Sequence, residues 1–211
     1  MRPVARLGVL LGALALLVPA RLSPQTPDGQ TPPLPKQALV AGAPYVRQSH
    51  PNTCGAAALA MLFKWAGVDL GEARILDACP QMKETGFWIP WLWELAGKQG
   101  LRFECGEGDP TIVKRWLAKG HPVIVYQYST EATRRPHLRV VIGYDDGENT
   151  FIVHDPAKEL GPNHRIAYPL FEKLWQLPYY SDENGEKKRF YFVLTSKAEP
   201  RPGAPAQSHD R

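Results

Sequence analysis

An α+β fold is the class that this 211-residue sequence predicts, with N-terminal helices packed on a C-terminal antiparallel sheet. Helical periodicity fills the segments between residues 54 and 119, whereas runs of β-forming residues follow between 122 and 194. The cluster 145–149 separates two of these runs and predicts a hairpin. Apolar residues make up 44% of the chain and charged residues 22%, which is typical of a globular domain and excludes a wholly disordered chain.

The N-terminus has the parts of a secretory signal peptide. Arg2 and Arg6 supply positive charge, Leu7–Val18 is an unbroken apolar run, and small residues up to Ala20 offer a cleavage site. We therefore expect residues 1–20 to be a signal peptide and the protein to be exported, to a periplasm or the medium. An uncleaved membrane anchor is the alternative, although the run is short for a hydrocarbon core of about 30 Å. After signal removal no stable membrane insertion is expected.

Proline-rich segments flank the central region. Five prolines lie in residues 21–37, a segment too poor in large apolar residues to build a core. Residues 197–211 have the same character. We therefore expect a linker over 21–37, one folded domain over 38–196 and a disordered tail over 197–211.

Four helices are expected in the first half of this domain. In the first, apolar residues recur on one face, Asn52 or Thr53 can cap the start, and Gly67 marks the end. The last begins with Pro110 in its first turn and is followed by Gly120. The four ranges are Cys54–Gly67, Gly71–Cys79, Ile89–Lys98 and Pro110–Lys119.

Strands are expected in the second half, because β-branched and aromatic residues are concentrated there. A short helix over Tyr168–Trp175 interrupts them. The expected strands are Pro122–Tyr128, Leu138–Tyr144, Thr150–Val153 and Phe190–Leu194.

The formal charge of +4 does not indicate a nucleic-acid partner. Three of the 25 basic residues lie in the first 21 positions, which hold no acidic residue. The remaining 22 nearly balance the 21 acidic residues, so the net charge of the expected mature protein does not argue for nucleic-acid binding, which requires a clustered basic face.

Cys54 stands at the predicted start of the first helix, and this position changes its chemistry. The partial positive charge and the N–H groups of a helix N-terminus stabilise an anion, which favours the nucleophilic thiolate. Gly55 lets a substrate backbone approach the sulfur closely. We therefore expect Cys54 to be a nucleophile rather than a core cysteine.

A nucleophilic thiolate needs a group that moves protons, and His137 is the expected one. It precedes the second strand, and Asp155 follows the strand paired with it, so Asp155 can orient the imidazole. Gln48 lies six residues before Cys54. Its side-chain N–H, together with the backbone N–H of Cys54, would form an oxyanion hole.

These assignments have rivals. His50 lies on the approach to the nucleophile, where it could only gate the site, and His121 is expected to be structural. His154 should point to the opposite face by period-two alternation, and His164 has no acidic orienter nearby in sequence. Asp145 sits at the far end of the hairpin.

Three motifs resemble a known family: QSHPNTCGAAALAML, PHLRVVIGY and FIVHDP. They are similar to motifs of the papain-like bacteriocin-processing cysteine peptidases, and most of all to a stand-alone, exported "C39-like" branch. In that family Gln precedes the catalytic Cys-Gly, and His and Asp-Pro follow. Gln48, Cys54, His137 and Asp155 stand at those positions. Thr53 departs from the pattern, because family members commonly carry Asp there.

The resemblance covers about residues 43–194. It implies a papain-like fold and cysteine peptidase activity, and the family trims double-glycine leader peptides. The expected function is therefore that of an exported thiol hydrolase acting on a peptide or protein substrate. Two alternatives stay open, a transglutaminase-like acyl transferase and a non-catalytic peptide-binding module of the same fold. This chemistry implies no metal or organic cofactor, and a zinc site in particular is not expected because the sequence has no CxxC or HExxH spacing.

The other two cysteines, Cys79 and Cys105, are either a disulfide pair or two buried thiols. Pairing would leave Cys54 as the odd thiol of an exported protein.

Overall fold

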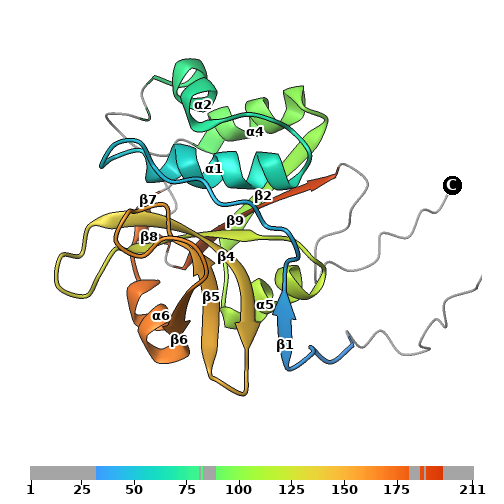
Figure 1. Ribbon diagram of the computed structural model, residues 1–211, viewed down its shortest axis with the longest axis vertical. Coiled ribbons are helices and arrows are strands. Elements are labelled where there is room, and N and C mark those ends of the chain that lie inside the picture. The colour runs from blue at the N-terminus through green and yellow to red at the C-terminus, as the bar shows by residue number, and fades with distance from the viewer. Residues whose placement is uncertain (1–31, 81, 83–88, 181–185, 188, 197–211) are drawn as a thin grey trace, which may run out of the picture. The chain divides into compact units, whose positions relative to one another are not determined.

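A seven-stranded antiparallel sheet forms the centre of the structure (Figure 1). Its strands follow the order β2-β9-β3-β4-β5-β6, and β1 pairs with the distal half of β4. The structure is a computed structural model that describes residues 32–80, 82, 89–180, 186–187 and 189–196. The described residues from 33 onward form one compact unit.

Strands β3 to β6 follow one another both in the chain and in the sheet, so this part of the sheet is built from consecutive hairpins. A separate two-stranded sheet pairs β7 with β8. The strands are β1 (Gln37–Leu39), β2 (Leu101–Glu107), β3 (Val123–Tyr128), β4 (Pro136–Asp145), β5 (Thr150–His154), β6 (His164–Ala167), β7 (Tyr179–Tyr180), β8 (Glu186–Lys187) and β9 (Phe190–Ser196).

Helices cover both faces of the main sheet. Alternate residues of β3 enter two different cores, Ile124 with the helices α1, α2 and α4, and Val125 with α5 and α6. Figure 1 shows these two groups of helices on opposite sides of the strands. The helices are α1 (Cys54–Trp65), α2 (Glu72–Ala78), α4 (Ile89–Lys98), α5 (Pro110–Ala118) and α6 (Tyr168–Leu174).

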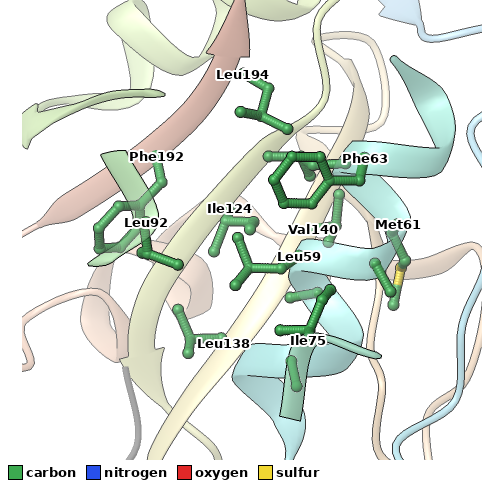
Figure 2. Close-up of a cluster of buried hydrophobic side chains, with 14 of the residues drawn as sticks. Leu59, Met61, Phe63, Ile75, Leu92, Ile124, Leu138, Val140, Phe192 and Leu194 are labelled. Carbon is green, nitrogen blue, oxygen red and sulfur yellow. The ribbon is translucent and has the colours of Figure 1, made fainter. Parts of the chain in front are cut away.

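The first core fixes α1 against the sheet. Every residue from Gly55 to Phe63 is buried, and the run Ala56–Ala58 lets the helix backbone approach its neighbours closely. Figure 2 shows Leu59 and Phe63 of α1 among side chains of the strands and of α2 and α4. A Leu→Ala change in such a core costs about 2–5 kcal/mol, so the start of α1 is held firmly in place.

The helices expected between residues 54 and 119 are all present. Their observed starts lie within one residue of the expected ones and their ends within two. The strand expected from Leu138 begins two residues earlier, at Pro136, and ends at Asp145. The strands β1, β2 and β6 and the small β7–β8 pair were not expected from the sequence.

The last residue of the expected linker, Gln37, is the first residue of β1. β1 pairs with β4 from Gln37 opposite Asp145 to Leu39 opposite Gly143, and the Tyr144 hydroxyl donates to the Pro35 carbonyl at 2.7 Å. The expected signal peptide and the tail over 197–211 lie outside the described residues. Among the described helices, none combines the length and the apolar character needed to cross a membrane.

Gly143 permits the contact between β1 and β4, and we predict that Gly143→Ala weakens it. A Cβ at this position would lie 2.6 Å from the carbonyl oxygen of Ala38, which is backbone and cannot rotate away. The expected loss of unfolding free energy is about 1–3 kcal/mol, measured by urea denaturation. Gly106→Ala in β2 is the matched control, because its Cβ would meet no atom within 4 Å. Equal stability of the two variants would contradict the prediction.

Candidate active site

The turn before α1 places Cys54 as the first residue of the helix. Thr53 occupies the N-cap position and is buried, but its side chain does not cap the helix as the sequence suggested. Its hydroxyl instead donates to the His50 carbonyl at 3.0 Å and accepts from the His50 N–H at 3.2 Å. The preceding loop is therefore closed onto the helix start.

The hairpin β4–β5 brings His137 and Asp155 together. His137 is the second residue of β4, and Asp155 directly follows β5. The His137 Nε2 and the Asp155 Oδ1 lie 2.9 Å apart, and both residues are buried. This interaction leaves Nδ1 of the ring for a second partner.

Cys54 is the other group that interacts with His137, through a hydrogen bond between the two side chains. Burial raises the pKa of the Cys54 thiol, but this bond, the charge of His137 and the backbone N–H groups of Leu138 and Gly55 outweigh burial and lower it below its ordinary value. For His137, burial lowers the pKa, and the bonds and charges of Asp155 and Cys54 raise it above its ordinary value. The opposite directions favour a thiolate–imidazolium pair.

Asp155 is held as an anion. Burial raises the pKa of its carboxyl group, and the hydrogen bond from His137 with the charges of His137 and Arg139 lowers it below its ordinary value. The Ala157 N–H donates to Oδ1 at 2.8 Å, and Arg139 Nε donates to Oδ2 at 2.6 Å. Both carboxylate oxygens therefore have partners.

Arg139 is the residue that sequence reasoning missed. Arg139 follows His137 by two residues in β4, so both side chains lie on the same face of the strand. Val140 pairs with His154, and continuing this register by one residue places Arg139 opposite Asp155. An arginine inside an apolar strand is almost never buried unless it is paired. That rule was the signal that could have pointed to Arg139.

Gln48 is brought near the site but not onto Cys54. Its backbone N–H donates to the Pro156 carbonyl at 3.0 Å, which ties the loop to the segment after Asp155. Its side-chain Nε2 donates to the His50 carbonyl at 2.9 Å, in the turn that precedes Cys54. The amide keeps a second N–H that this bond does not use.

The rival residues make other contacts. His121 is buried against Trp65 and Trp116, and His154 contacts the Ala43 carbonyl. His50 Nδ1 lies 2.9 Å from the Ser49 hydroxyl, and His164 begins β6. The side chain of Asp145 accepts from the N–H groups of Gly147 and Glu148 in the hairpin turn.

A family model described as the peptidase C39-like family matches residues 40–182, which is more than half of the chain. The chain belongs to this family. Membership supports a cysteine peptidase at the level of the family, which confirms the resemblance that the motifs predicted. No curated protein sequence matches the chain.

Solved structures of two C39-type peptidase domains share the fold. The peptidase domain of Streptococcus ComA, a bi-functional ABC transporter, has a TM-score of 0.54 at 22% identity and covers 72% of this chain and 97% of its own. A double glycine motif protease from an AMS/PCAT transporter, solved with the leader peptide, has a TM-score of 0.52 at 18% identity and covers 75% and 96%. These likenesses confirm the papain-like fold of this C39-like chain.

The pairing considered for Cys79 and Cys105 is wrong, because no disulfide joins these two residues in the structure. Cys79 is buried in the first core, where burial raises the pKa of its thiol. The pKa of the Cys79 thiol is therefore raised, whereas that of the Cys54 thiol is lowered.

We predict that Thr53→Val disturbs the helix start while Thr53→Ser does not. Valine has the same shape but loses both side-chain hydrogen bonds to His50, whereas serine keeps the hydroxyl. The expected cost in Thr53→Val is about 1–3 kcal/mol of unfolding free energy, together with slower alkylation of Cys54. Urea denaturation and iodoacetamide labelling measure the two effects. Thr53→Ser losing as much as Thr53→Val would argue against a role for the hydroxyl.

Proposed function

We propose that the protein is an exported thiol peptidase that uses Cys54 as nucleophile, His137 as general acid and base, Asp155 as orienting group and Gln48 in the oxyanion hole. The observation that carries the proposal is the continuous hydrogen-bonded chain from Cys54 through His137 to Asp155. Membership of the C39-like family supports the reaction class.

In the proposed reaction, the Cys54 thiolate attacks the carbonyl carbon of a peptide bond. The backbone N–H of Cys54 and the second N–H of the Gln48 amide stabilise the oxyanion. His137 then protonates the leaving amine as the C–N bond breaks, which leaves an acyl-enzyme. A water molecule deprotonated by His137 attacks the acyl carbon, the acid departs and the thiolate returns.

A peptide substrate is the class that the family favours, and the related transporter protease was solved with a leader peptide. Residues 1–20 as a signal peptide, 21–37 as a linker and 197–211 as a tail around the 38–196 domain belong to the same proposal. In this arrangement the enzyme meets its substrate outside the cytoplasm.

We predict that iodoacetamide labels Cys54 well below pH 7 and that His137→Ala abolishes this early labelling. Without His137 the largest remaining influence on the thiol is burial, which raises its pKa. Labelling in the variant should therefore begin only near or above the ordinary cysteine value of about 8.5. Mass spectrometry resolves Cys54 from Cys79 and Cys105, and His164→Ala is the control. Identical pH profiles in wild type and His137→Ala would contradict the ion pair.

We predict that the wild-type protein cleaves members of a diverse peptide library and that Cys54→Ala cleaves none. Mass spectrometry of the products identifies the broken bonds. Adding an excess of a primary amine separates two reactions, because a peptidase releases free acids and an acyl transferase releases amides. A library left intact by a wild-type protein whose Cys54 is an ion-paired thiolate would contradict peptidase activity, and retention of uncleaved peptides would then favour the binding module.

A further inference from the structure

Arg139 makes an unusual set of buried contacts beside the proposed site. Its side chain is 2% exposed. Nε donates to Asp155 Oδ2 at 2.6 Å, one terminal nitrogen donates to the Tyr128 carbonyl at 3.1 Å, and the other donates to the Ser129 carbonyl at 2.6 Å. Since arginine stays protonated in proteins, this guanidinium is a permanent positive charge next to the carboxylate.

The charge count of the site shows what this cation does. With Cys54 as a thiolate and His137 as an imidazolium, an isolated Asp155 carboxylate would add a second negative charge to a buried site. That charge would stabilise the imidazolium but repel the thiolate, because Coulomb interactions are strong in a poorly hydrated interior. Arg139 removes this excess, since the Asp155–Arg139 pair has no net charge.

We propose that Arg139 is a positioning residue that neutralises Asp155 and fixes its carboxylate, so that Asp155 orients the His137 ring without adding net negative charge beside Cys54. The proposal rests on the function assigned above to Cys54, His137 and Asp155. It makes the orienting unit a carboxylate–guanidinium pair rather than a single carboxylate.

In the described part of the chain, His137 and Arg139 are the cations that act on the Asp155 carboxylate, whereas Arg47, which acts on Tyr45, is exposed. Tyr45 feels the charge of Asp155, and Tyr126 feels that of Cys54; burial is the largest cause that raises the pKa of each phenol above its ordinary value. Both phenols are therefore neutral at working pH. His154 faces Ala43 and Tyr45, and burial lowers its pKa, which keeps its ring neutral as well.

The direction in which each substitution shifts the pKa of His137 follows from this charge count. Arg139→Met leaves Asp155 without its counter-charge, so the imidazolium is stabilised and the pKa of His137 rises. Asp155→Asn leaves Arg139 as an unbalanced cation, so the pKa of His137 falls. The double variant restores a pair without net charge, and its His137 pKa should lie between those of the two single variants. A purely structural role for Arg139 would not produce this order.

Titration of His137 by NMR measures the order of its pKa values in the three variants. A Cys54→Ser background is used, because this measurement needs neither a thiolate nor activity. Arg139→Met should raise the His137 pKa by about 1 unit or more, the size expected for one nearby charge. His164 is the internal reference. Arg102→Met is the control variant, because it removes the arginine of another buried carboxylate, Glu104 in β2, and should leave His137 unchanged.

Loss of folding does not block the test. Removing one member of a buried ion pair is strongly destabilising, so Arg139→Met alone can prove too unstable to titrate. In that case Asp155→Asn is compared with the double variant, where the added Arg139→Met change should raise the His137 pKa. Urea denaturation should also show the double variant to be more stable than Asp155→Asn.

Three results would overturn the proposal: an unchanged His137 pKa in folded Arg139→Met, a double variant outside the interval of the two single variants, or a double variant less stable than Asp155→Asn. Failure of the proposed function looks different. It would appear in the alkylation of wild-type Cys54, which would rise only near its ordinary pKa, whatever His137 does in the Cys54→Ser background.

Discussion

The buried carboxylate of Asp155 is the group on which the rest of the site depends. At 1% exposure it has almost no access to water, so its charge persists only because the protein supplies the partners. Three groups are these partners: the side chains of His137 and Arg139 on β4, and the backbone N–H of Ala157 after β5. The carboxylate in turn sets the direction of the His137 ring, and the ring sets the ionisation of the Cys54 thiol. Each of these interactions is a directional hydrogen bond, so the position of the Asp155 carboxylate affects the ionisation of the Cys54 thiol through the His137 ring.

The fold brings together parts that are remote in the chain. The first core seats α1 against the sheet and so places the helix start near the beginning of β4. Two further ties hold the loop before α1: Gln48 donates from its backbone to Pro156, and the Ser49 N–H donates to the Glu72 carboxylate in α2. The loop that carries Gln48, the proposed oxyanion-hole residue, is therefore bound both to the segment after β5 and to α2. A substrate would meet these groups in a fixed arrangement.

The sequence predicted those features that depend on local pattern. Strong periodicity located the helices, and the hairpin placed His137 beside Asp155 because both flank paired strands. It did not reveal β2, where Arg102, Glu104 and Gly106 break the β-forming pattern and the strand lies at the end of the sheet order. Arg139 escaped notice for a different reason. Its partner directly follows another strand, and register is a property of the folded sheet that composition does not disclose.

Charge balance links stability and chemistry in this site. A buried ion costs several kcal/mol unless it is paired, so a change that removes one charge of the Asp155–Arg139 pair destabilises the fold and shifts the proton affinity of His137 together. Loss of activity in a single variant therefore cannot separate an orienting role from a structural one. A change that removes both charges can, because it spares the cost of an unpaired ion while it alters the field at the imidazole.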